Sequence, residues 1–123
     1  DKTVALYGVT YKPDIDDIRE SPVMIIKALL EEEGCNVRVC DSHAAEKIEN
    51  NFGIYDAAKD ADIAVLGVNH REFETVDFGK LKSVMRGNAV LDTRNYWSQS
   101  SVENAGLDYY LLGKSDKMDK WEN

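Results

Sequence analysis

The apolar positions of this 123-residue chain fall into short runs that polar segments separate. Five runs are rich in β-branched and aromatic residues and have the length of buried strands. They cover residues 3–8, 36–40, 62–67, 89–92 and 108–112. The segments between them predict helices or helical turns over 21–33, 44–50, 56–61, 78–85 and 98–105. Strands therefore alternate with helices along most of the chain.

This alternation specifies an α/β fold: a doubly wound, Rossmann-like parallel five-stranded sheet with helices on both faces. We expect the strand order 3-2-1-4-5, which puts the switch point, where such sheets bind ligands, between the first and fourth strands. The predicted domain spans residues 1–113. Residues 114–123 form a polar tail with Met118 and Trp121 as its apolar members, and we expect this tail to fray.

A long polar segment joins the first strand to the first helix. It runs from Tyr7 to Pro22, with the sequence YGVTYKPDIDDIRESP. Ser21 followed by Pro22 predicts a helix start, with the serine oxygen capping free N–H groups. Strand–loop–helix junctions at the carboxyl edge of α/β sheets bind anionic ligands, and loops of unusual length are often functional. This loop carries two cations, Lys12 and Arg19.

Lys12 and Arg94 are candidates for an anion site, because Arg94 follows the fourth strand. If the first and fourth strands are neighbours, both cations emerge at one edge of the sheet. Arginine can hold a phosphate or carboxylate through two parallel hydrogen bonds, lysine adds a compact charge, and Tyr11 can stack on a base or sugar. Composition alone favours an alternative, in which each cation pairs with nearby carboxylates: Asp14, Asp16 and Asp17 for Lys12, and Asp92 for Arg94.

Composition excludes some classes of protein. A net charge of −8 argues against nucleic acid as a partner, because nucleic-acid binding normally shows as a basic face. It does not exclude a nucleotide, which needs only one or two well-placed cations. The sequence contains neither a run of ~18 apolar residues nor a signal-peptide pattern, so we expect no membrane span and a cytoplasmic location. Because residue 1 is Asp rather than Met, we expect a piece of a longer protein. Cys35 and Cys40 would point to opposite faces of a strand, which predicts buried thiols rather than a disulfide.

Several signatures of known sites are missing from the sequence. Residues 8–10, Gly-Val-Thr, do not begin a G-x-G-x-x-G motif, so we predict no self-sufficient dinucleotide site. His43 and His70 have no ligand-spaced partners, so we predict no metal site and interpret His70 as a hydrogen-bonded loop residue. The third strand ends without a phospho-acceptor aspartate, which argues against a receiver domain.

Several motifs resemble the C-terminal, UDP-binding domain of the UDP-glucose/GDP-mannose dehydrogenase family. YGVTYKP at 7–13 and DDIRESP at 16–22 resemble its opening signature. Further matches follow in order: VCD at 39–41, DIAVL at 62–66 with His70 and Phe73, and LDTRN at 91–95. The resemblance covers residues 1 to about 113. Within the family, the chain is most similar to the bacterial or archaeal branch that acts on UDP-N-acetylmannosamine or a similar sugar.

Members of this family oxidise the C6 hydroxyl of a nucleotide sugar to a carboxylate, with two NAD molecules used in turn and a cysteine-bound thioester. The resemblance implies that the catalytic cysteine and the NAD-binding domain lie outside this chain. We therefore expect no catalytic residue here and no activity from the chain alone. The implied partners are a UDP-sugar, the N-terminal half of the enzyme, and further copies in a homo-oligomer.

The resemblance also implies roles for individual residues. Lys12 and Arg94 would contact the UDP-sugar and Tyr11 would lie beside the nucleotide, which favours ligand contact over local ion pairing. Arg19 would contact NAD across the gap between domains, although an ion pair with Asp17 or Glu20 fits the sequence equally well. The alternative function is a free-standing Rossmann-like module that binds a nucleotide or another anion.

Overall fold

The computed structural model describes residues 2–19, 21–48 and 51–112. Its centre is one five-stranded sheet in which all neighbouring strands are parallel. The strands are β1 (Thr3–Tyr7), β2 (Asn36–Cys40), β3 (Ile63–Leu66), β4 (Ala89–Asp92) and β5 (Asp108–Leu111). They agree with the five predicted runs to within a residue or two at each end. The predicted tail at 114–123 lies outside the described residues.

The predicted strand order is wrong. The observed order is β2-β1-β3-β4-β5, so β3 rather than β4 lies beside β1. The reason is burial: the β3 sequence, IAVL, is apolar at every position and is buried at three of its four residues. By contrast, β2 carries Asn36, which is exposed, and Arg38, which is half-buried. An inner position therefore suits β3 and an edge position suits β2. With this order the switch point lies between β1 and β3, not between β1 and β4.

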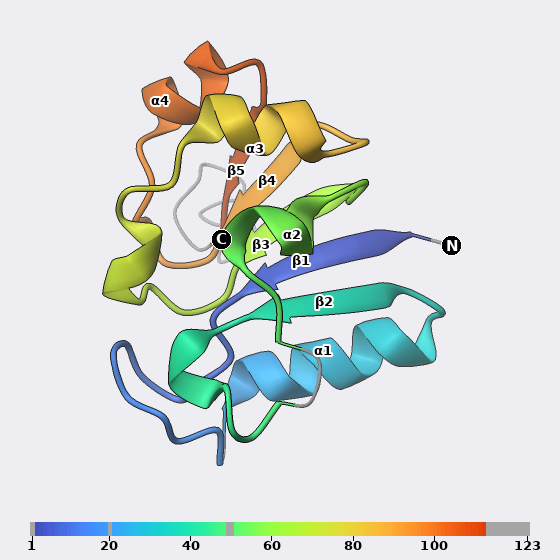
Figure 1. Ribbon diagram of the computed structural model, residues 1–123, viewed down its shortest axis with the longest axis vertical. Helices are drawn as coiled ribbons and strands as arrows, with labels where there is room; N and C mark the ends of the chain where they lie inside the picture. The colour runs from blue at the N-terminus through green and yellow to red at the C-terminus, as the bar shows by residue number, and fades with distance from the viewer. Residues whose placement is uncertain (1, 20, 49–50, 113–123) are drawn as a thin grey trace, which may run out of the picture.

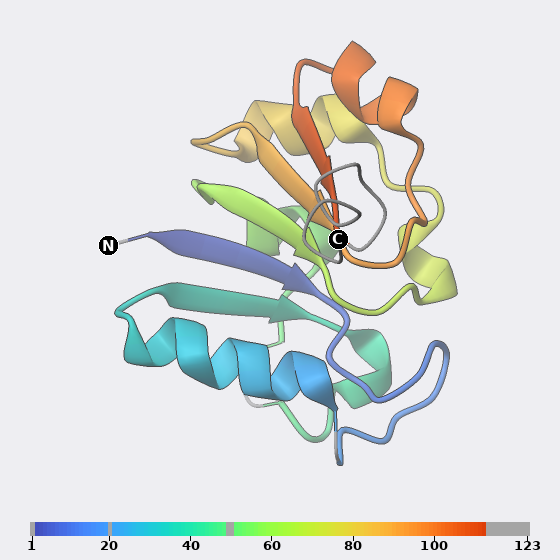
Figure 2. The same cartoon turned by 180° about the vertical axis from the view of Figure 1, so that it is seen from behind.

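Helices cover both faces of the sheet, as predicted (Figures 1 and 2). On one face, α1 (Pro22–Glu32) packs through Val23, Met24 and Leu30 on side chains of β1, β2 and β3. The other face carries three helices, α2 (Ile54–Ala58), α3 (Phe78–Val84) and α4 (Gln99–Asn104). None of the helices in the described part of the chain has the length and apolar character needed to cross a bilayer.

Two local predictions need correction. The helix expected over 44–50 is instead a short 3-10 turn, η1 (Ser42–Ala44), where the described residues cover that segment. Asp41 explains this turn, because its carboxylate accepts the His43 N–H at 3.0 Å. Pro22 does begin α1, but the Ser21 hydroxyl does not cap the helix. It donates instead to the carbonyl of Thr10 at 3.3 Å, which ties the end of the long loop to its beginning.

The tips of β1 and β3 approach each other closely at two glycines. A Cβ on Gly67 would lie 2.6 Å from the carbonyl oxygen of Gly8, and a Cβ on Gly8 would lie 2.5 Å from that of Val68. Gly8 also has a φ of +87°, a conformation in which other residues are strained. Glycine at these positions lets the chain turn away from the sheet on both sides of the switch point.

Candidate functional site

Arg94 lies two residues after the end of β4 and is held by the Gly67 carbonyl and the Asp92 carboxylate. Its Nε donates to the carbonyl of Gly67 at 2.9 Å, and its backbone N–H donates to Asp92 Oδ1 at 2.9 Å. Arg94 also lines a cavity of about 180 Å³ together with Pro22 and Val23 at the start of α1. The N-terminus of a helix favours anions. The guanidinium and the start of α1, which border the same small cavity at the carboxyl edge of the sheet, would therefore both favour an anion there.

Asp92 does not pair with the Arg94 side chain, contrary to the local ion-pair alternative. Its two carboxylate oxygens accept hydrogen bonds from other donors, all at 2.8 or 2.9 Å. These donors are the backbone N–H groups of Arg94, Tyr96 and Trp97 and the hydroxyl of Tyr109. The aspartate thus organises the turn that carries Arg94, and within the described residues the guanidinium has no carboxylate partner.

Lys12 and Tyr11 lie in the loop between β1 and α1, and both are exposed. The Lys12 ammonium lies 5.7 Å from the centroid of the Tyr11 ring, which is 45% exposed. The ion pairs found within the described residues involve neither Lys12 nor Arg94. Nearby acids have other partners: Asp14 lies near His43 and Arg71, and Asp17 pairs with Arg19.

The two predicted cations share an edge of the sheet but not a pair of neighbouring strands. Because all strands are parallel, the loop after β1 and the segment after β4 both leave at the carboxyl edge, with the β3 segment between them (Figure 1). Arg94 borders the start of α1, and Lys12 lies in the loop that leads to it. The two cations therefore leave the same edge of the sheet, but the expectation that they follow neighbouring strands is wrong.

Arg19 forms a bidentate ion pair with Asp17. Its Nε donates to Oδ1 and its Nη2 to Oδ2, both at 3.0 Å. These side-chain hydrogen bonds, together with one from the Arg19 backbone N–H, lower the pKa of Asp17 to about 2. Of the acids considered as partners of Arg19, Asp17 is engaged, and Glu20 lies outside the described residues. A contact between Arg19 and NAD stays a prediction.

A buried polar network beneath the loop was not predicted from sequence. His70 and Asp41 are both fully buried, and His70 Nε2 lies 2.9 Å from Asp41 Oδ2. The same nitrogen lies 3.2 Å from Thr10 Oγ1, and Nδ1 accepts the backbone N–H of Asp14 at 2.8 Å. Burial raises the pKa of Asp41, but hydrogen bonds from His70 and from the backbone N–H of Val9 lower it by more, so the net shift is downward.

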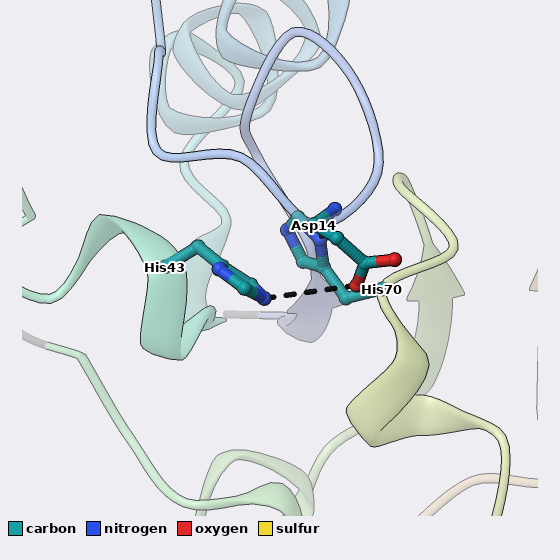
Figure 3. A group of neighbouring side chains, drawn as sticks. All are labelled: Asp14, His43 and His70. Carbon is teal, nitrogen blue, oxygen red and sulfur yellow. Dashed lines mark hydrogen bonds and ion pairs between the residues drawn. The ribbon is translucent and has the colours of Figure 1, made fainter.

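Asp14, His43 and His70 place potential metal-ligand atoms within 4.8 Å of one another (Figure 3). The spacing of His43 and His70 in the sequence gives no sign that they are neighbours, but their ring centroids lie 4.4 Å apart. Both ring nitrogens of His70 already have hydrogen-bond partners, as described above, and Asp14 Oδ1 accepts the N–H of Arg71 at 2.9 Å. In this arrangement His70 has no free lone pair for a metal, and the cluster acts as a hydrogen-bonded support of the loop.

Comparison with known proteins identifies the family. A model of the UDP-glucose/GDP-mannose dehydrogenase family, UDP binding domain, matches residues 5–99. The chain is 34% identical over 113 residues to a UDP-N-acetyl-D-mannosamine dehydrogenase of Methanocaldococcus jannaschii, covering 89% of this chain and 26% of that protein. It is 32% identical over 120 residues to a UDP-glucose 6-dehydrogenase of Rhizobium meliloti, covering 92% and 28%.

Solved structures agree with this assignment. The UDP-N-acetyl-mannosamine dehydrogenase of S. aureus aligns with a TM-score of 0.77 at 30% identity, over 92% of this chain and 26% of that one. A dehydrogenase from Pyrococcus horikoshii shares the fold with a TM-score of 0.82 at 24% identity, over 94% and 26%. The chain thus spans about a quarter of the length of these relatives. It belongs to the UDP-glucose/GDP-mannose dehydrogenase family and corresponds to the UDP-binding domain of its members.

Proposed function

We propose that this chain is the part of an NAD-dependent nucleotide-sugar 6-dehydrogenase that holds the UDP moiety of the substrate. The observation that carries the proposal concerns Lys12 and Arg94, which follow parallel strands at the carboxyl edge of the sheet and have no ion-pair partner in the described residues. Arg94 also lines the cavity at the start of α1. The complete enzyme would oxidise the C6 hydroxyl of the sugar to a carboxylate. The proposal covers UDP-sugars as a class, since relatives named for two different sugars match at 34% and 32% identity.

In the proposed complex the diphosphate lies at the carboxyl edge of the sheet. Arg94 uses Nε to bind Gly67, which leaves its terminal nitrogens for two parallel hydrogen bonds to a phosphate. Lys12 supplies a second positive charge from the loop, and the exposed ring of Tyr11 stacks on the uracil. The apolar floor of the Arg94 cavity, formed in part by Leu6 and Val65, excludes water and strengthens the charge interactions.

The chemical step is assigned to other parts of the enzyme. Burial raises the pKa of the Cys40 thiol to about 12, so this cysteine is not a nucleophile near neutral pH. The turn after β1 does not fit the pyrophosphate of NAD, because the close contact between Gly8 and Gly67 leaves no open glycine cradle. We therefore assign NAD binding to the N-terminal half, with Arg19 contacting the cofactor only after it releases Asp17.

The proposed partners follow from this division of labour. They are the UDP-sugar, the N-terminal half of the enzyme and further copies in a homo-oligomer, with a cytoplasmic location. Within the chain, residues 1–113 form the proposed UDP-binding domain.

The experiment is a UDP titration of this chain by NMR or calorimetry, alongside Lys12→Ala and Arg94→Ala. Loss of one charged contact is expected to weaken binding about tenfold. Lys27→Ala is the matched control, because Lys27 pairs with Glu31 within α1 and does not line the Arg94 cavity, so its loss should leave affinity unchanged. Equal affinity of the wild type and both variants would refute the proposed site. Turnover of NAD and a UDP-sugar by this chain alone would refute the assignment of chemistry to other parts.

A further inference from the structure

The loop segment around Lys12 is held in place by a residue that is distant in sequence. His70 contacts the loop on both sides of Lys12, through Thr10 before it and Asp14 after it. Thr10 also binds Lys12 directly, because its hydroxyl donates to the Lys12 carbonyl at 2.8 Å. A single buried imidazole thus brackets the lysine from both sides.

The hydrogen-bond partners fix where the protons of this network lie. The N–H of Asp14 donates to Nδ1 of His70, so Nδ1 carries no proton and the neutral ring is protonated at Nε2. The Nε2–H then donates to Asp41 Oδ2 and to Thr10 Oγ1, whose own proton goes to the Lys12 carbonyl. Every donor has an acceptor in this one arrangement, so the network is consistent with a single tautomer.

Asp14 is a position at which the loop needs such support. Its φ is +59°, a left-handed conformation that most non-glycine residues adopt only when their surroundings enforce it. His70 binds its backbone N–H, and the backbone N–H of Arg71 donates to its Oδ1 at 2.9 Å. Two consecutive residues at the start of η2 (Arg71–Phe73) therefore hold the strained residue beyond Lys12.

We propose that His70 is the positioning residue of Lys12: from a buried site after β3 it holds the loop in the conformation that presents the lysine to the ligand. Its effect on UDP affinity rests on the function proposed above. Its hold on the loop does not, because that is a property of the unliganded chain. Asp41 orients His70 from the opposite side of the ring, at 2.9 Å.

Substitutions of His70 can test the hydrogen-bonding roles of its two ring nitrogens separately. Asparagine can place its side-chain oxygen near the Nδ1 position, so His70→Asn retains an acceptor for the Asp14 N–H. Glutamine can place its amide near the Nε2 position, so His70→Gln retains a donor to the buried Asp41 and loses the acceptor. His43→Asn is the matched control. The His43 ring lies 4.4 Å from that of His70, and its Nε2 lies 3.7 Å from the Asp14 carboxylate, but in the part of the chain described here the His43 side chain makes no hydrogen bond to the loop backbone.

The test measures amide hydrogen exchange of Asp14 by NMR in the 123-residue chain, with the amides of Leu81 and Val90 as reporters of an intact core. His70→Gln is expected to speed Asp14 exchange at least about fivefold, the effect of one net hydrogen bond, whereas His70→Asn and His43→Asn stay within about twofold of the wild type. Unchanged Asp14 exchange in His70→Gln, with the core intact, would overturn the proposal.

A UDP titration of the same proteins then tests the consequence for the ligand. UDP affinity is expected to fall about fivefold in His70→Gln and to recover in His70→Asn. Faster loop exchange in His70→Gln at unchanged UDP affinity would overturn the positioning of Lys12. If the wild type and Lys12→Ala bind UDP equally, the proposed function fails, while the exchange data still decide whether His70 holds the loop.

Discussion

Removal of the Asp92 carboxylate is expected to damage both stability and the Arg94 turn. Asp92 is fully buried at the end of β4. Its Oδ1 accepts one bond, from the Arg94 N–H, and its Oδ2 accepts three, from the N–H groups of Tyr96 and Trp97 and the hydroxyl of Tyr109. Asp92→Ala removes all of these acceptors from donors that are partly or fully buried.

The size of the effect follows from the donors that lose their partner. A buried donor without an acceptor costs about 1–3 kcal/mol, and water reaches the partly buried Arg94 N–H more readily than the buried Trp97 N–H. We expect a loss of about 4 kcal/mol for Asp92→Ala, out of a typical total of about 5–15 kcal/mol. Asp92→Asn keeps one oxygen, which can accept from the three donors at Oδ2. Its NH₂ group then faces the Arg94 N–H, a second donor, so we expect a loss of stability of about 2 kcal/mol.

Urea unfolding of both variants, followed by circular dichroism, measures these losses. Asp108→Asn is the control, because Asp108 is exposed on the adjacent strand β5 and should change stability by less than about 0.5 kcal/mol. Asp92→Asn should also weaken UDP binding if the chain folds, since the turn loses the bond that fixes the Arg94 backbone. A loss below about 1 kcal/mol for Asp92→Ala would refute the reasoning.

Two further predictions concern stability. Gly8→Ala is expected to cost more than about 3 kcal/mol in urea unfolding, because the new Cβ would lie 2.5 Å from the Val68 oxygen at a positive φ. Gly34→Ala, with φ of +91° in open space, should cost only about 1 kcal/mol, and equal losses would contradict the close-contact argument. The second prediction concerns Asp62, whose pKa is lowered by hydrogen bonds from Arg86 and a backbone N–H. The ionised carboxylate therefore stabilises the folded chain above about pH 4, and this contribution to the free energy of unfolding is lost as pH falls. Asp62→Asn should show a smaller drop in urea midpoint between about pH 7 and about pH 3, and an equal drop would refute this role.

The sequence pattern predicts the elements of the fold better than their order. Each strand is a local run of apolar residues, so its position can be found from the chain alone. Strand order depends on which strands bury both faces, and the expected order ignored that requirement. Asn36 and Arg38 in β2, set against the uniformly apolar β3, carried the information that β2 lies at the edge.

The sequence is enough to place a residue that follows one strand, but not to find contacts that bring several distant segments together. Lys12 and Arg94 follow strands, so the carboxyl edge could be assigned to them from sequence. His70, by contrast, lies 29 residues from Asp41 and 60 from Thr10, and no local pattern relates such positions. Asp41 and His70 both fall within the motifs that matched the family, which was the available signal.

Two buried aspartates explain how a chain of net charge −8 can present two cations to an anion. Asp41 accepts hydrogen bonds from the N–H groups of Val9 and His43 and from His70, and Asp92 accepts those of the turn after β4. Because neutral donors satisfy both carboxylates, neither aspartate forms an ion pair with Lys12 or Arg94. In the proposed site these two aspartates therefore shape the loops that carry Lys12 and Arg94 without pairing with either cation, and short-range attraction to the ligand would outweigh the screened charge of more distant surfaces.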